Sequence, residues 1–154
     1  MIHFLVARLS HPATSDSQTI ADSQQLVELA KEILEPGNVN HQPVFSFDGS
    51  LLSSIFGVAT RCRIRRIRRD AIQLLKIYPR REGFWDSEMA AKVAEWFVDT
   101  EEEGLRPDEE VSPDSRLIMV SNNFVLSERK TTVRCAKQVK GKPTEVLPPV
   151  LLKW

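Results

Sequence analysis

The sequence predicts a mainly α fold: a helical bundle or stacked helical hairpins of about four or five helices, with a C-terminal antiparallel β-hairpin. Apolar residues recur every three or four positions through much of residues 1–106, and Pro or Gly interrupts them at intervals. After an acidic segment at Pro107–Pro113, the pattern changes to short, β-branched, partly alternating runs. We therefore expect one structural domain, with a helical part over residues 1–106 and a β-hairpin tail over residues 107–154 packed on it.

Composition excludes several classes of protein. The 154 residues are 42% hydrophobic and 27% charged, which is ordinary for a globular chain and argues against wholesale disorder. The 21 basic residues balance 21 acidic ones, so no net charge draws the whole protein to DNA or to an acidic membrane. The apolar start of the chain reaches polar residues too soon for a signal peptide or a membrane span, which predicts a soluble intracellular protein.

Two helices are expected in the first third of the chain. Ile2–Leu9 carries one apolar stripe at helical spacing and needs a partner to cover it. Asp16 or Ser17 can cap a second helix that runs to about Glu35, where Pro36 and the following glycine end it.

A third helix is predicted after a short apolar run at Val44–Phe47. Asp48 is a suitable N-cap, and the helix runs from Leu51 to about Arg61. Gly57 lowers its intrinsic helix propensity by roughly 1 kcal/mol, so packing has to hold it.

The arginine-rich segment that follows predicts a fourth helix with one apolar face. Its stripe consists of Ile64, Ile67, Ala71, Leu74, Leu75 and Tyr78. Arg68 lies at the boundary of the stripe. The opposite face, expected to be solvated, contains Arg65, Arg66, Arg69, Gln73 and Lys76. Of these, Arg65, Arg66, Arg69 and Lys76 are the candidate phosphate or partner contacts.

The segment Pro79–Ser87 is expected to connect two helices. Pro79 ends the fourth helix, and Asp86 is placed to cap a fifth one. We assign this segment a structural role as turn and cap, carried by Arg80, Arg81, Glu82, Trp85 and Asp86. The fifth helix should bury Met89, Val93, Trp96, Phe97 and Thr100, and expose Glu88, Lys92, Glu95, Asp99 and Glu102.

The last third of the chain predicts strands. Leu117–Leu126 and Lys130–Val139 flank Ser127–Arg129, and this arrangement predicts a β-hairpin with its turn at Ser127–Arg129. Val150–Trp154 is a short apolar end that either adds a strand or packs on the helices.

No residue pattern points to catalysis, to a cofactor or to a metal. Motifs for nucleophilic hydrolysis, phosphate cradles, dinucleotide binding and zinc proteases are all missing from the sequence. Cys62 and Cys135 are far apart and lack His or Cys neighbours at ligand spacing, so we expect Cys62 to be a small buried apolar residue. We therefore expect a protein that is not an enzyme.

Several segments together resemble the C-terminal region of fungal binuclear zinc cluster transcription factors, the group with the fungal-specific transcription factor domain. The resemblance is strong over Phe45–Trp96, and its most specific piece is Arg80–Ser87. It rests on Phe45–Asp48, Val58–Arg63, Ile67–Leu75, Pro79–Ser87 and Ala90–Trp96.

The resemblance implies a nuclear regulator, in a group often linked to secondary metabolism, whose DNA-reading part is a cysteine-rich zinc cluster. The two cysteines of this chain cannot form that cluster. The sequence also departs from the family pattern in two places. Ile64 and Arg65 stand where an Asp-Pro usually separates two helices, so these helices could fuse, and Gly49–Ser54 lacks the usual prolines.

Three functions follow as expectations. The first is a regulator that acts through a protein partner or a homo-oligomer, using exposed apolar helix faces, with DNA reached only indirectly and no membrane contact. The second is a sequence-independent nucleic-acid binder that uses Arg61–Arg81. The third is a truncated remnant without independent activity.

Overall fold

The computed structural model describes residues 17–37, 44–46, 51–106, 109–137 and 141–154. The predicted stripe at Ile2–Leu9 and the proposed caps Asp16 and Asp48 lie outside these residues.

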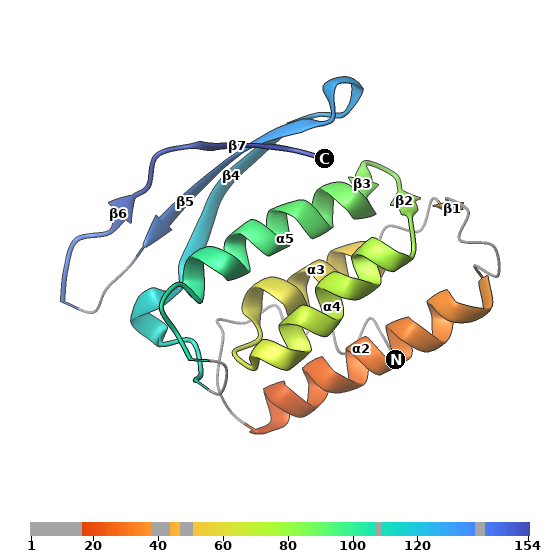
Figure 1. Ribbon diagram of the computed structural model, residues 1–154, viewed down its shortest axis with the longest axis horizontal. Coiled ribbons are helices and arrows are strands. Elements are labelled where there is room, and N and C mark those ends of the chain that lie inside the picture. The colour runs from red at the N-terminus through yellow and green to blue at the C-terminus, as the bar shows by residue number, and fades with distance from the viewer. Residues whose placement is uncertain (1–16, 38–43, 47–50, 107–108, 138–140) are drawn as a thin grey trace.

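Four α-helices form the first part of the described chain: α2 (Ser17–Gly37), α3 (Leu51–Arg61), α4 (Arg65–Ile77) and α5 (Ser87–Glu101). Figure 1 shows them stacked, with α2 against α3 and α4, and α5 between that pair and a β-sheet. Helices α3 and α4 do not fuse. Ile64 has an extended backbone (φ −82°, ψ 111°) and separates them without a proline.

The C-terminal part is a four-stranded sheet rather than a single hairpin. Strands β4 (Leu117–Val125) and β5 (Lys130–Lys137) form the predicted antiparallel hairpin, joined by a short 3-10 turn and Arg129 in the left-handed region (φ 47°). Strands β6 (Glu145–Val146) and β7 (Val150–Lys153) both pair with β5 on its other side. With these strands the fold is mixed α and β rather than mainly α.

A second, smaller sheet includes the predicted connection between α4 and α5. Strand β1 (Val44–Ser46) pairs in parallel with β2 (Arg80–Glu82), and β2 pairs antiparallel with β3 (Trp85–Asp86). Gly83 occupies the first central position of the two-residue turn between β2 and β3, where its positive φ of 58° favours glycine.

Two apolar clusters hold the layers together. One lies among the four helices and includes Leu26, Ile55, Leu75 and Val98, all fully buried. The other lies between α5 and the inner face of the large sheet, where Val93 and Phe97 meet Val133 and Cys135. Each buried Leu, Ile or Val contributes roughly 1.5–3 kcal/mol, so the apolar contacts between α5 and the sheet are a main source of cohesion for the C-terminal part.

Candidate functional site

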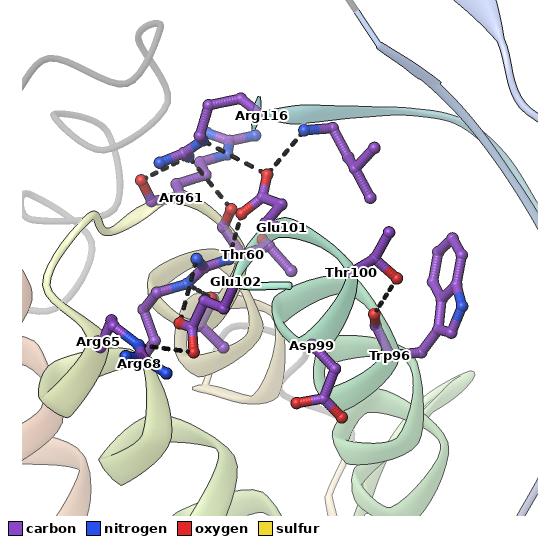
Figure 2. A network of polar contacts seen from close by, with 12 residues as sticks. Thr60, Arg61, Arg65, Arg68, Trp96, Asp99, Thr100, Glu101, Glu102 and Arg116 are labelled. Carbon is purple, nitrogen blue, oxygen red and sulfur yellow. Dashed lines mark hydrogen bonds and ion pairs between the residues drawn. The ribbon is translucent and has the colours of Figure 1, made fainter. Parts of the chain in front are cut away.

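Arg68 lies at the centre of a buried polar network that joins three helices (Figure 2). Its side chain is fully buried, which corrects the expected place at the edge of the apolar stripe. Its Nε donates to the carbonyl oxygen of Ala59 in α3 (2.8 Å), and its Nη2 donates to Oε2 of Glu101 at the end of α5 (2.5 Å). One guanidinium therefore links the end of α3, the first turns of α4 and the end of α5.

Glu101 extends this network to the sheet. Its Oε1 accepts from the backbone N–H of Leu117 at the start of β4 (2.7 Å) and lies 3.5 Å from Nε of Arg116. Arg116 Nη2 donates to the carbonyls of Thr60 and Arg61, which is the favourable place for a cation at the C-terminal end of α3. Burial lowers the pKa of Arg116 from its ordinary value, although Glu101 opposes the shift.

Glu102, directly after α5, binds two more arginines of α4. Its Oε2 accepts from Nε of Arg65 (3.0 Å) and Nη2 of Arg69 (2.8 Å), and its Oε1 lies 3.6 Å from Nη1 of Arg68. The prediction that Glu102 belongs to the solvated face of α5 is wrong, because these contacts bury it. Burial alone would lower the pKa of Arg69, but its hydrogen bonds to Glu102 and Asp99 outweigh burial and raise that pKa.

The four candidate phosphate or partner contacts fall in different surroundings. Arg65 and Arg69 bind Glu102, the C-cap residue of α5, and Lys76 binds Glu95 within α5, so three of the four cations are paired with carboxylates at this helix. The side chain of Arg66 remains 68% exposed and pairs only loosely with Asp70, at 3.4 Å one turn along the same helix. A phosphate would have to compete with the α5 carboxylates for most of this surface.

Glu82 links the turn between α4 and α5 to α3. Its buried carboxylate lies 2.7 Å from Nε of Arg80 and accepts at Oε2 from the backbone N–H of Leu52 (2.9 Å), in the first turn of α3. The N-terminal N–H groups of a helix lack intrahelical partners, so Glu82 satisfies one of them across a long sequence separation.

Asp86 caps α5. Its Oδ1 accepts from the backbone N–H groups of Glu88 and Met89, both at 3.0 Å, which is N-cap geometry. Trp85 packs its ring against Phe56 of α3, with ring centroids 5.4 Å apart. Arg81 is exposed, and its Nε reaches only the carbonyl of Gly83 at 3.4 Å.

Most exposed large apolar side chains of the described residues belong to strands and turns rather than to helix faces. Ile118 and Val146 both lie opposite Ala136 in neighbouring strands, so they share the outer face of the large sheet, away from α5. Phe84, at the β2–β3 turn, is 63% exposed and stacks on Phe124 of β4, with ring centroids 6.4 Å apart.

A groove of about 380 Å³ runs between α2 and α4 on another part of the molecule. Its floor is apolar, with Val27, Ile67 and Leu74, and charged side chains such as Lys31 line it as well. This mixed lining contains no His, Cys or Ser that could begin a reaction.

Neither thiol lies in a reactive or metal-binding environment. Cys62 is buried as predicted. Cys135 of β5 is buried against α5, and this burial, with a smaller contribution from Glu101, raises the pKa of its thiol to about 11. Among the described residues, no group of three or more His, Cys, Asp or Glu side chains is arranged to hold a metal ion. Within the same ranges, no helix is both long and apolar enough to cross a membrane.

Comparison with known proteins identifies no relative: no family model, no curated protein and no solved structure matches this chain.

Proposed function

We propose that this chain is a protein-contact module of a fungal transcription regulator, similar to the C-terminal region of the binuclear zinc cluster factors. In this proposal it acts by binding other protein chains and reaches DNA only through them. A link to secondary metabolism and a nuclear location follow from the same resemblance.

The observation that carries the proposal is the engagement of the arginine-rich helix with α5. Arg65 and Arg69 share the carboxylate of Glu102, and Lys76 pairs with Glu95. Binding to a nucleic-acid backbone depends on cations that are free to displace counterions from phosphates. Cations already neutralised within the fold supply little of that attraction, which favours the protein-contact function over sequence-independent nucleic-acid binding.

The exposed apolar side chains supply a surface suited to protein contact. Phe84, Val146 and Leu151 are each more than half exposed. Val146 is also next to exposed Ile118, since both lie opposite Ala136, and contiguous exposed apolar groups mark interaction sites more often than isolated ones do. Val146 and Leu151 lie on strands and Phe84 lies on the β2–β3 turn, so the contact we propose is made by the sheet and that turn rather than by helix faces.

A tethering experiment tests this proposal. The chain is fused to a heterologous DNA-binding domain that has no effect of its own, and transcription of a reporter bearing that domain's site is measured in a fungal cell. We expect the fusion to change reporter output severalfold, and Phe84→Ser to reduce the change because it removes an exposed ring. Glu103→Ser, at another exposed position, serves as the matched control. An unchanged reporter, with the fusion present in the nucleus by immunoblot, would overturn the proposal.

A further inference from the structure

Strand β4 forms one edge of the large sheet. The strands are ordered β4-β5-β6, β7 also pairs with β5, and β4 has no strand partner other than β5 among the described residues. An edge strand presents unpaired backbone N–H and C=O groups, which natural proteins usually protect with charged side chains or proline. The nine residues of β4, Leu117–Val125, include neither. Among the described residues the edge of β4 is therefore unpaired, and β4 carries no charge or proline that would keep another strand away.

The pairing of β5 shows which backbone groups of β4 face outward. The carbonyl oxygen of Cys135 accepts from the backbone N–H of Leu147 (2.9 Å), and the carbonyl oxygen of Arg129 accepts from that of Trp154 (3.1 Å). The backbone groups of every second residue from Arg129 to Cys135 therefore point to β6 and β7. In an antiparallel ladder the residues between them face the opposite neighbour. Thr132 therefore bonds its partner Asn123 in β4.

The residues on either side of Asn123 consequently point the other way. Asn122 and Phe124 direct their backbone N–H and C=O groups to the free edge. A β-bulge between Met119 and Ser121 interrupts the strand, so the regular part of this edge runs from Ser121 to Val125.

We propose that β4 pairs antiparallel with β4 of a second copy of this chain, with Asn123 opposite its own counterpart on the two-fold axis. In this register Asn122 of one copy lies opposite Phe124 of the other. Both residues face the edge, so each donates to and accepts from the other. In a register centred on Asn122, only Asn122 would lie opposite its own counterpart as an edge-facing pair within Ser121–Val125. A register centred on Phe124 has the same limit. Both registers would therefore form fewer hydrogen bonds than the one centred on Asn123.

The charge and the exposed rings at this edge are compatible with a second copy of the chain. The segment is uncharged and the whole chain has a formal net charge of +0, so two copies meet without electrostatic repulsion. The stacked rings of Phe84 and Phe124 are partly exposed beside the edge, and a paired strand would cover them. The inference rests on the proposed function, because it names the partner of the same contact surface.

Disulfide trapping of the full chain tests the register. Asn123 is a non-hydrogen-bonded position opposite itself, where Cα atoms lie roughly 4.5 Å apart, within reach of a disulfide. Asn123→Cys should oxidise to a dimer with twice the 17.5 kDa mass on non-reducing gels. Lys153→Cys, also exposed on β7 but outside the apolar contact surface, is the matched control and should stay monomeric on the same gels. The native thiols are buried and do not compete.

Sedimentation of the unmodified chain and a proline variant tests the hydrogen bonds. Wild type should be dimeric at micromolar concentration. Phe124→Pro removes an edge N–H that β5 does not use, and should weaken the dimer at least tenfold while circular dichroism stays native. If that variant does not fold, Asn123→Lys, which sets like charges opposite each other, takes its place and should weaken the dimer equally.

The outcomes separate this inference from the proposed function. A monomeric wild type, or trapping of Lys153→Cys as efficient as that of Asn123→Cys, overturns the strand pairing, even if the tethered reporter still responds. A trapped dimer together with a silent reporter overturns the proposed function and leaves the pairing in place.

Discussion

Replacing Arg68 by Met tests the buried network by removing the guanidinium while keeping an unbranched apolar side chain about as long as the arginine stem. The variant loses the hydrogen bond to Ala59 and the ion pair with Glu101. It leaves a buried carboxylate whose remaining partners are the N–H of Leu117 and a more distant Arg116. Removing one partner of a buried pair typically costs about 3–5 kcal/mol, because the other charge stays buried without compensation.

That cost is large for a chain of this size. Domains are stable by about 5–15 kcal/mol, and each kcal/mol shifts the melting temperature of a domain of this length by about 2–4 °C. We therefore expect Arg68→Met to melt about 6–20 °C below wild type in a circular dichroism scan. Arg66→Met is the matched control on the same helix, because Arg66 is largely exposed and its pair with Asp70 is worth about 0–1 kcal/mol.

A double-mutant cycle separates the ion pair from the loss of packing. Arg68→Met, Glu101→Gln and the double variant are unfolded with urea, and the coupling free energy between the two positions should be about 0.5–3 kcal/mol. The reasoning is refuted if Arg68→Met is no less stable than Arg66→Met, or if the two substitutions are strictly additive.

Three further predictions concern caps, the core and a thiol. Asp86→Ala should lower the free energy of unfolding by about 1 kcal/mol, because it removes the acceptor for the backbone N–H groups of Glu88 and Met89. Asp86→Asn keeps an acceptor oxygen and should retain most of that stability. Equal urea midpoints for the two variants would contradict the cap. Leu75→Ala should cost about 2–5 kcal/mol because Leu75 is fully buried, against less than about 0.5 kcal/mol for exposed Gln73→Ala. For Cys135 the folded pKa of about 11 lies above the ordinary 9.0, so its contribution to stability is complete below pH 9 and is lost as pH rises toward 11. The free energy of unfolding should fall more steeply over that range in wild type than in Cys135→Ala; parallel curves would refute the assignment.

Local patterns in the sequence located most helices. The bounds of α3 match the prediction, and the Asp86 cap marks the start of α5, because a cap and an apolar stripe are written in neighbouring residues. The strands β1 and β2 were not predicted as a pair, since three residues at 44–46 meet three at 80–82 across a long sequence separation.

The arginine network could be predicted only in part. Arg68 is three and seven positions before Ala71 and Leu75, which places it inside the apolar stripe on a helical projection, so its burial could have been expected. Its partner could not, because Glu101 is the last residue of α5, and only the packing of α5 on α4 brings the two together. The three consecutive glutamates at residues 101–103 show that carboxylates are available, but they do not show which of them reaches Arg68.

The most direct test of the central claim, that the arginine-rich helix is neutralised by α5 and does not serve as a phosphate surface, is fluorescence anisotropy with labelled DNA. The full chain is titrated into duplex and single-stranded DNA at low and at physiological salt. We predict no binding at micromolar protein in either salt, and no change with Arg66→Met. Binding that falls steeply with salt and is lost when Arg65, Arg66 and Arg69 are replaced would contradict the account.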